Sequence, residues 1–462
     1  MVARPHPSAL GRPVAVAGLA GLAVGLGVLA GLNPEAAVAA SLGCVFVAAV
    51  LSNLLAGVYL FGLVAFLEVL PGLGGGVSFA KFAGALLAVS WLATLTSRRE
   101  MGDEFPARHP TATWVGALFL AWATLSLLWA PEVGTGLEAL TRYALNLLLV
   151  VILFSAIRTR RHVLVLIAIL VGGALLSGAY GLLVAHAGTV GEGSARLGGA
   201  GVDANFLAAL LVAALVLAAT LASLDEVARS GRLVAGLCVV LAAAGVAATV
   251  SRSGLVSLAV VLLAGLALAG RGRRLGMLAL AVVAVASFTA YFTAVAPRED
   301  LNRIQHAGDE GRLDLYTIAW RMIEAHPVEG VGVGNFTVAS VHYLLRPGAI
   351  ERSEFIVDTP KATHNTYLQV GAEMGVVGLA LFVFLLGFAI CCALEAARRF
   401  GRAGDPAMDL VSRGVAVAAL GVLASNLFVS EQFSKPLWLL LGLGPVLLAI
   451  ARRETAARDV AA

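Results

Sequence analysis

Residues 204–223 read ANFLAALLVAALVLAATLAS and contain no charged side chain. A helix of about 20 apolar residues is long enough to cross the ~30 Å hydrocarbon core of a bilayer. Similar runs recur along the chain, which is 60% hydrophobic and 13% charged, with a mean hydropathy of +0.92. The sequence therefore predicts an all-α polytopic membrane protein. The runs are continuous rather than alternating, which excludes a transmembrane barrel.

The hydropathy rule gives about fourteen membrane spans, and twelve to fourteen is the expected range because two pairs of runs join closely near Asn53 and Ser251. The first run, Pro13 to Leu32, is long and is followed at once by further spans, so we interpret it as an uncleaved helix and not as a signal peptide. The predicted spans lie near 13–31, 36–52, 54–70, 77–96, 111–130, 139–157, 163–186, 204–223, 233–250, 253–270, 275–295, 366–396, 410–430 and 433–450.

A polar stretch from Pro297 to Asn365 interrupts these runs and divides the chain into three parts. Residues 1–296 are the N-terminal transmembrane helices, 297–365 form one large loop between late helices, and 366–462 hold the last helices and a short tail. Polar residues kept at a membrane boundary are typical of a place where something is bound or reacted. The loop is therefore the first candidate for a functional region.

The distribution of arginine predicts the orientation of the chain. If the N-terminus is cytoplasmic, the inside connections hold clusters such as Arg98-Arg99, Arg160-Arg161 and Arg452-Arg453, whereas the outside connections near 33–35 and 71–76 hold no Lys or Arg. This is a positive-inside pattern. It predicts that both termini are cytoplasmic and that the large loop, with ten Asp/Glu against seven Lys/Arg, is extracytoplasmic.

All four cysteines, Cys44, Cys238, Cys391 and Cys392, lie within apolar runs. A disulfide framework is not expected, and no Cys/His spacing typical of a metal site occurs. We interpret the cysteines as small buried hydrophobes.

Five cations depart from the charge pattern and lie near the predicted outer face, namely Lys81, Arg142, Arg196, Arg252 and Lys435. Snorkelling or pairing with a nearby carboxylate, such as Glu138 for Arg142, is our interpretation of Lys81, Arg142 and Lys435. Arg196 lies in a glycine-rich turn and Arg252 in a short turn with no acid close in sequence. Because a guanidinium binds phosphate oxygens bidentately, these two arginines are candidates for binding a diphosphate; pairing of Arg196 with Glu192 or Asp203 is the alternative.

Within the large loop, residues 312–324 have helical spacing, with Leu313, Tyr316, Trp320 and Ile323 on one face that we expect to lie against the membrane or the bundle. The alternating glycines Gly330, Gly332 and Gly334 resemble a phosphate-binding loop, but the strand and helix that such a loop requires do not flank them. They predict a tight loop that shapes a site.

His364 is the candidate general base, since it lies where the polar loop re-enters the bilayer, beside Asn365. A neutral imidazole accepts a proton near pH 7 with little tuning. Glu373 lies about two and a half turns further along the expected helix, too far to orient His364 directly. It is expected to face the bundle interior and to meet Arg252 or an acceptor.

These segments together resemble the O-antigen ligase and polymerase superfamily. The resemblance rests on VEGVGVGNF at 328–336, HNTYLQ at 364–369, EMG at 373–375, RLGGAGVDANF at 196–206 and SRSG at 251–254. It implies twelve to fourteen helices with a late periplasmic loop in the bacterial inner membrane. It also implies inverting transfer of a glycan from an undecaprenyl diphosphate carrier to a hydroxyl acceptor such as lipid A-core, with no metal, cofactor or nucleic acid.

Carried over to this sequence, the resemblance makes His364 the general base and makes Arg196 and Arg252 the ligands of the diphosphate. The motif residues that would shape the site or bind the acceptor are Asn365, Tyr367, Gln369, Glu373, Arg312, Gly332 and Gly334. The sequence leaves open which sugar and acceptor are used, which helices hold the polyprenyl tail, and the oligomeric state.

Two alternatives remain. A polysaccharide polymerase of the same superfamily differs in its acceptor alone, and we favour the ligase because the motif match is tightest there. A transporter or flippase of lipid-linked sugars predicts inverted repeats and charges in mid-membrane. No second copy of the loop occurs, and Glu68 and Arg142 lie near the ends of their spans.

Overall fold

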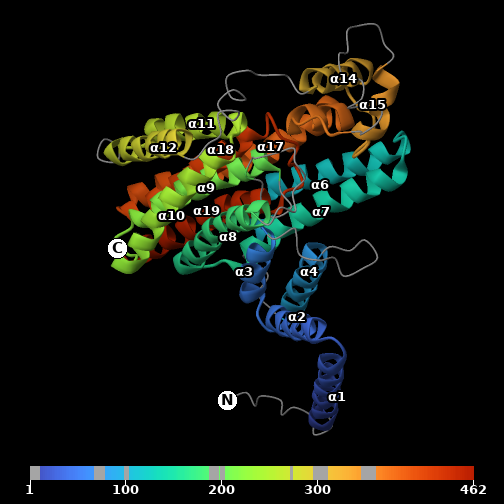
Figure 1. The fold of residues 1–462 in the computed structure, drawn as a ribbon, viewed down its shortest axis with the longest axis vertical. Coiled ribbons are helices and arrows are strands. Elements are labelled where there is room, and N and C mark those ends of the chain that lie inside the picture. The colour runs from blue at the N-terminus through green and yellow to red at the C-terminus, as the bar shows by residue number, and fades with distance from the viewer. Residues whose placement is uncertain are drawn as a thin grey trace.

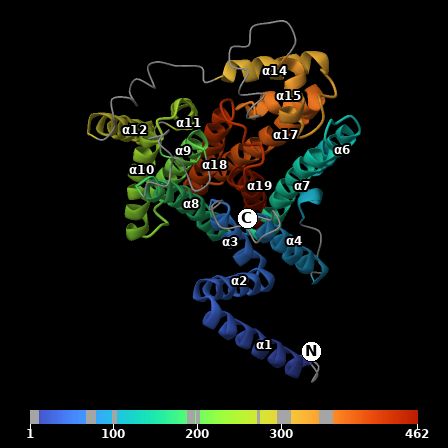
Figure 2. The ribbon, with the colours of Figure 1, turned by 45° about the vertical axis from the view of Figure 1, so that its right-hand side comes forward.

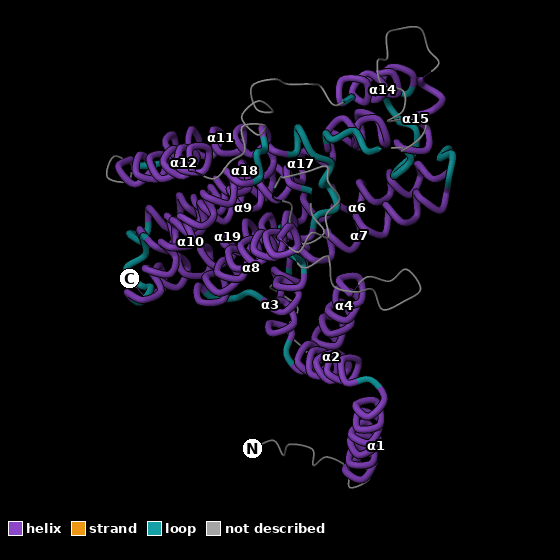
Figure 3. The backbone as a smooth tube through the Cα atoms, in the orientation of Figure 1, coloured by secondary structure: helices purple, strands orange, loops and turns teal. Residues whose placement is uncertain are grey.

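The structure is a computed structural model, and it describes residues 11–66, 79–97, 104–186, 197, 203–270, 274–294, 311–344 and 361–461. Within these ranges every regular element is a helix (Figure 3). The elements are α1 (Gly11–Leu32), α2 (Pro34–Ser52), α3 (Leu54–Val64), α4 (Phe79–Ser97), α5 (Phe105–Arg108), α6 (Pro110–Leu125), the 3-10 helix η1 (Ser126–Leu128), α7 (Val133–Ala156), α8 (Arg160–His186), α9 (Ala204–Ala222), α10 (Arg229–Ala248), α11 (Arg252–Leu268), α12 (Arg274–Ala294), α14 (Arg312–Ala325), α15 (Phe336–Leu344), α17 (Thr366–Arg402), α18 (Pro406–Ser425) and α19 (Lys435–Ala461).

Nine of the described helices are long and apolar enough to cross a membrane. Five shorter apolar helices of 10–17 residues lie within α1, α2, α3, α4 and α11. Each of the fourteen spans expected from hydropathy coincides with one of these helices. The prediction of an all-α polytopic membrane fold is therefore confirmed.

In each of the two closely joined pairs of spans, a side-chain cap marks the start of the second helix. Asn53 begins α3, and its Oδ1 accepts from the backbone N–H groups of Leu55 and Ala56 at 3.0 and 3.2 Å. Ser251 begins α11 in the same way, with its Oγ accepting from Gly254 N–H at 3.2 Å. A side-chain cap satisfies amide groups that the first helical turn leaves unpaired. Each junction therefore separates two distinct helices.

Helices α9, α18 and α19 form the centre of the bundle, whereas α12 lies at its margin. The buried share of the span is 89% for α9 and 11% for α12. Close approach needs small residues, and a Cβ at Gly444 of α19 would lie 2.1 Å from the carbonyl oxygen of Ala389 in α17. Helix α1 contacts α2 and projects away from this centre (Figures 1 and 2).

Helices α14 and α15 lie across one end of the bundle, which we call the loop end (Figure 1). The face of α14 that packs inward carries Leu315, Ile318 and Met322, all at most 2% exposed. Leu313 and Trp320 are each 56% exposed, so the face predicted from helical spacing is not the one buried against the bundle. The surfaces on both sides of α14 are apolar, and periodicity alone did not distinguish them.

At the opposite end of the bundle an ionic cluster joins three helices. Arg160 at the start of α8 contacts Asp405 before α18 at 2.5 Å and donates from Nε to Glu454 of α19 at 2.8 Å. Arg399 near the end of α17 donates to Glu395 at 2.9 Å. Arginines that the charge pattern assigns to the cytoplasmic side thus lie away from the loop end.

Helix α17 is bent near its start, where Gly375 has φ 64° and ψ −170°. A Cβ at Gly375 would lie 2.0 Å from the carbonyl oxygen of Val328, so glycine alone fits both the conformation and the contact. The freed backbone groups find partners outside the helix: Val376 N–H donates to Pro327 O at 2.8 Å, and Met374 O accepts from Trp122 Nε1 at 2.9 Å. The bend separates a short segment, 366–374, from the long remainder of α17.

Candidate functional site

His364 immediately precedes the cap of α17, and several hydrogen bonds fix the backbone around it. Asn365 Oδ1 accepts from the N–H groups of Tyr367 and Leu368, both at 3.0 Å. Thr363 Oγ1 accepts from Asn365 N–H at 3.1 Å and donates to Asn365 O at 2.8 Å. The side chain of Asn365 thus caps the helix, so its contribution is to place His364.

The connection between α18 and α19, residues 426–434, supports the start of α17 from one side. Thr366 N–H donates to Asn426 O at 2.9 Å, and Thr366 Oγ1 donates to Val429 O at 2.9 Å. Tyr367 donates its hydroxyl proton to Leu423 O at 2.8 Å. Two residues expected to shape the site, Asn365 and Tyr367, therefore anchor it through bonds within the protein.

The N-terminal half of α14 supports His364 from the other side. Tyr316 OH lies 3.4 Å from His364 O and 3.2 Å from Leu427 O. Arg312, the first residue of α14, is half-buried one turn earlier. His364 thus lies between α14 and the α18–α19 connection, with its side chain partly exposed.

Arg252 is the first residue of α11 and is exposed, and the turn that presents it is held by buried polar contacts. Ser251 Oγ donates to Asn205 Oδ1 of α9 at 2.9 Å and lies 2.8 Å from Ser253 Oγ. These three polar side chains are at most 5% exposed. Buried hydroxyl and amide groups need such partners, so the network fixes the backbone turn from which the Arg252 side chain extends.

The two non-glycine residues with positive φ in the described part of the chain are His364 itself and a residue close to Arg252. His364 has φ 54° and Val250, two residues before Arg252, has φ 49°. The conformation is especially unfavourable for a β-branched valine. Backbone strain of this kind costs of order 1–3 kcal/mol and clusters at functional sites.

Arg252 and His364 lie at the same end of α18. Ser257 in α11 donates to Gly421 O at 2.7 Å, one turn before the end of α18, and Asn426 directly after α18 accepts from Thr366. The outer turns of α11 and α17 therefore flank the C-terminal end of α18. The structure brings these two predicted site residues to one region of the loop end.

Arg196 lies outside the described residues. Its neighbour Leu197 is described and is 5% exposed. Leu197 N–H donates to Ala248 O at 3.2 Å, at the end of α10 and four residues before Arg252. The backbone next to Arg196 thus lies beside the turn that presents Arg252.

Glu373 faces the interior as expected, but its partners differ from those expected. It is fully buried, with Oε1 accepting from Gln369 Nε2 at 3.0 Å and Oε2 accepting from Gly334 N–H at 2.9 Å. Its carboxylate therefore binds the glycine loop of residues 330–336 and does not meet Arg252. Gln369 and Gly334, which we expected to shape the site, belong to the same cluster.

The glycine loop forms a tight connection, as its glycines predict. It packs onto α17. Gly330, Gly332 and Gly334 have φ 69°, 104° and 71°. Val331 N–H donates to Ala372 O at 2.9 Å and Gly332 N–H to Glu373 O at 2.8 Å. The left-handed conformation at every second residue explains why glycine alternates here.

Asn335 and Ser126 were not expected to matter, yet they tie the glycine loop to α7 and η1. Asn335 is fully buried; its Oδ1 accepts from Glu132 N–H at 2.8 Å, and its Nδ2 donates to Glu132 O at 3.2 Å. Ser126 Oγ accepts from Val333 N–H at 3.0 Å. The sequence signal for Asn335 was its position directly after the glycine run. Its partner Glu132 could not be found in this way, because it lies about two hundred residues away.

Arg142 and Lys81, two of the cations that depart from the charge pattern, are paired with a carboxylate as expected. Arg142 Nη2 and Lys81 Nζ lie 2.6 and 3.4 Å from Glu138 Oε1. All three side chains are about half exposed, so each pair contributes little to stability. Among the described residues no group of three or more His, Cys, Asp and Glu side chains could hold a metal ion.

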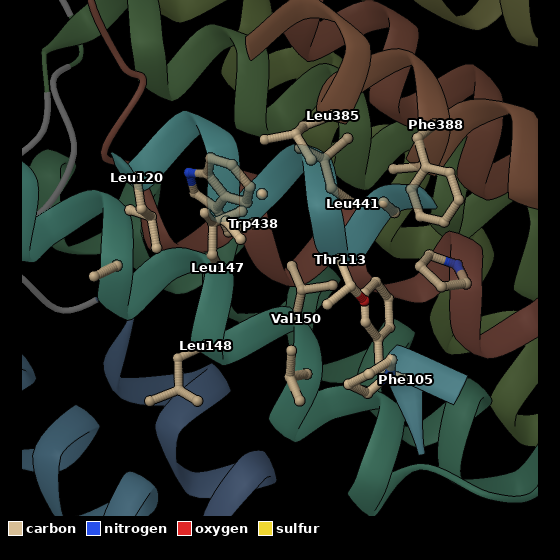
Figure 4. Close-up of a pocket in the computed structure, with 18 residues that line it drawn as sticks. Phe105, Thr113, Leu120, Leu147, Leu148, Val150, Leu385, Phe388, Trp438 and Leu441 are labelled. Atoms are coloured by element: carbon tan, nitrogen blue, oxygen red, sulfur yellow. The ribbon is translucent and has the colours of Figure 1, made fainter. Parts of the chain in front are cut away.

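An apolar groove lies between α6, α7, α17 and α19 (Figure 4). Its volume is about 310 Å³, and it is partly open. Leu120, Leu147, Leu385 and Trp438 point into it from the four helices (Figure 4). Trp438 Nε1 donates to Gln432 O at 2.8 Å, which joins the groove to the connection that supports His364.

Comparison with protein families adds an independent finding. Residues 237–383 match a family model described as O-antigen ligase. Over this segment the chain is similar to O-antigen ligases. The match confirms the resemblance to the O-antigen ligase superfamily seen in the sequence. No curated protein matches the chain.

The matched segment covers about a third of the chain, from α10 to the first half of α17. It includes Arg252, the glycine loop, His364 and Glu373. It excludes Asn205, which holds the Arg252 turn, and the 426–434 connection, which holds His364. The matched residues thus supply the candidate chemistry, and helices before and after them place it.

Proposed function

We propose that this protein is an O-antigen ligase that transfers a glycan from undecaprenyl diphosphate to a hydroxyl acceptor such as lipid A-core. The observation that carries the proposal is the position of Arg252 and His364 at one end of α18, within the segment that matches the O-antigen ligase model. A cation suited to a diphosphate and a base suited to a hydroxyl then face one substrate. The reaction would occur on the extracytoplasmic face of the bacterial inner membrane.

In the proposed reaction, His364 accepts the proton of the acceptor hydroxyl as its oxygen attacks the anomeric carbon. The new carbon–oxygen bond forms while the bond from the anomeric carbon to the phosphate oxygen breaks. One displacement inverts the anomeric configuration. The imidazolium then releases its proton to solvent.

Arg196 and Arg252 would stabilise the diphosphate leaving group. Negative charge grows on the phosphate oxygens as the bond breaks, and a fixed guanidinium at that place lowers the barrier. The buried network of Ser251, Ser253 and Asn205 supports this role because it holds the Arg252 backbone in place before the donor binds. No metal or cofactor is needed in this scheme.

The polyprenyl tail of the donor would lie in the groove between α6, α7, α17 and α19. Its lining is almost wholly apolar, which suits an isoprenoid chain. Its Trp438 end is hydrogen-bonded to the connection beneath His364. A tail held there would leave its diphosphate at the loop end.

The test is glycan transfer by the purified full-length chain in detergent, with chelator throughout and undecaprenyl diphosphate glycan as donor. We expect His364→Ala to lower kcat by about 10²–10⁴-fold, the range for loss of a general base. We expect Arg252→Ala and Arg196→Ala to lose most activity and Arg252→Lys to retain part of it, because lysine keeps the charge but not the bidentate fork. Arg232→Ala is the matched control, since Arg232 pairs with Asp225 at 2.6 Å between α9 and α10, away from α14.

Undiminished transfer by folded His364→Ala would rule out the general-base role. The acceptor that receives the glycan distinguishes the remaining candidate functions. Transfer to lipid A-core marks a ligase, and transfer to another carrier-linked unit marks a polymerase of the same superfamily. Movement of lipid-linked sugar across vesicles without transfer would mark a transporter.

A further inference from the structure

A second cavity at the loop end lies apart from His364 and Arg252. It has a volume of about 630 Å³ and lies between the connection from η1 to α7, the connection from α14 to α15, and α15. This volume is within the ~300–1,000 Å³ typical of small-molecule sites. Its functional side chains are Trp129, His326, Glu329, His342 and Tyr343. The reaction proposed above uses none of them.

The residues that form the floor of the cavity are held by hydrogen bonds and by hydrophobic packing. Val331, part of that floor, donates its N–H to Ala372 O of α17, and Arg321 Nη1 donates to Tyr343 O at 2.9 Å. Leu315 and Met322 pack beneath it in a separate hydrophobic cluster. The site is thus largely formed before any ligand arrives.

The walls combine aromatic rings with hydrogen-bonding groups. Trp129 and Tyr343 supply aromatic surface, and the buried Nε1 of Trp129 has no acceptor in the described part of the chain. His326 Nδ1 and Glu329 Oε1 lie 3.0 Å apart, with both side chains about 40% exposed. The hydrogen bond from His326 lowers the pKa of Glu329, so Glu329 is an acceptor at neutral pH.

The charge of the described lining does not favour phosphate as a ligand. Among the described residues no Lys or Arg lines the cavity, and the fully charged side chain there is the carboxylate of Glu329. A pyranose ring fits this chemistry: its C–H face packs on an aromatic ring, and its hydroxyls donate to a carboxylate. A neutral, hydroxyl-rich ligand is therefore expected.

We infer that this cavity binds a pyranose unit of the glycan, several units from the reacting bond. The distance of the cavity from His364 supports this separation. Val331 of the cavity binds Ala372, which is eight residues beyond His364, about 12 Å along a helix. Helix α14 joins the two places, with Tyr316 beside His364 and His326 in the cavity. The inference rests on the proposed function only in naming the glycan as substrate.

The test measures binding of neutral trisaccharides, namely chitotriose, maltotriose and mannotriose, to the full-length protein in detergent by saturation-transfer NMR titration. We expect at least one to bind saturably, and Glu329→Gln to raise its Kd about tenfold or more, as loss of one hydrogen bond to a charged group does. We expect Trp129→Ala, which removes the aromatic surface, to raise the Kd as well. Glu324→Gln and Trp320→Ala are matched controls, since Trp320 Nε1 donates to Glu324 at 2.6 Å on the exposed side of α14 outside the cavity. Unfolding temperatures check that all variants fold.

Absence of saturable binding by all three sugars would overturn the inference, as would equal affinities in cavity and control variants. Competition by inorganic pyrophosphate would also overturn it, because it would mark an anion site. Trisaccharide binding in a protein that transfers no glycan would leave the inference standing and defeat the proposed function. In an active protein, a raised KM for acceptor or for donor in Glu329→Gln identifies which glycan occupies the cavity.

Discussion

The carboxylate of Glu373 accepts a hydrogen bond from the backbone N–H of Gly334, with Oε2 and N 2.9 Å apart. The bond joins α17 to the glycine loop of residues 330–336, which in turn contacts η1 and α7. A fully buried carboxylate needs such donors, because an unpaired one is costly. Glu373 is therefore a residue that positions the loop on the helix that begins at His364.

Gly334→Ala is expected to destabilise the protein strongly. Gly334 has φ 71°, and a Cβ there would lie 2.7 Å from Ala139 Cβ and 2.9 Å from Thr135 O. Strain of about 1 kcal/mol is then added to a clash that costs about 1–3 kcal/mol. Unfolding temperature in detergent measures the sum. Gly404→Ala is the control, because Gly404 also has φ 71° but nothing lies within 4 Å of its Cβ; equal losses in both variants would contradict the clash.

His364→Gly is expected to be inactive yet at least as stable as His364→Ala. At φ 54° alanine retains strain that glycine relieves, a difference of about 1 kcal/mol. Both variants lack the imidazole and should lose about 10²–10⁴-fold in kcat. Paired melting curves and transfer rates check this. A glycine variant clearly less stable than the alanine variant would show that His364 does not hold the left-handed conformation.

His109 is expected to make stability fall at acid pH. It is 5% exposed, with its ring 5.2–5.6 Å from those of Phe105, Phe154 and Phe388. Burial, with Arg452 and Arg108 nearby, lowers its pKa to about 4 from an ordinary value of 6.5. The unfolded chain thus binds the proton more readily, so stability is complete above pH 6.5 and declines as pH falls toward 4, by on the order of 3 kcal/mol.

The measurement is the unfolding temperature of wild type and His109→Phe between pH 7.5 and 4.5. The phenylalanine variant keeps the aromatic contacts but removes the titrating group, so its curve should be flatter over this range. Parallel curves for the two proteins would assign the acid sensitivity to other groups.

Gly116→Leu is expected to raise the KM for the polyprenyl donor several-fold while leaving kcat nearly unchanged. Gly116 lines the apolar groove, and the nearest atom to a Cβ there is Leu147 Cδ1 at 3.9 Å, so a larger side chain extends into the groove. Loss of binding surface common to ground and transition states acts on KM. Gly172→Leu on the exposed side of α8, with nothing within 4 Å, is the control. A KM equal to that of the control would remove the groove as the place of the tail.

The helices were largely predictable from the sequence, because hydropathy acts over local windows. The exceptions are helix ends: α18 ends at Ser425, before the predicted end at 430, whereas charged residues continue α17 to Arg402 and α19 to Ala461, beyond the predicted ends at 396 and 450. Arg399 pairs with Glu395 one turn earlier, and Arg160 reaches Glu454. Such pairs stabilise helical turns outside the apolar run, which a hydropathy window does not detect.

The candidate site was predictable as residues but not as contacts. His364 and Arg252 stood out by charge and by position in the chain. The partners of Glu373 and Asn335 did not, because Gly334 and Glu132 are brought to them by tertiary packing, 39 and 203 residues away in sequence. The same limit explains why periodicity did not select the buried face of α14.

The bend of α17 at Gly375 has a mechanical consequence. A membrane-crossing helix tilts when the thickness of the surrounding bilayer changes. In α17 the long part after Gly375 would tilt, whereas residues 366–374 are fastened to the glycine loop and to the 426–434 connection. The glycine would then act as a joint between the two parts, and the backbone at the start of α17, next to His364, would stay where these bonds hold it.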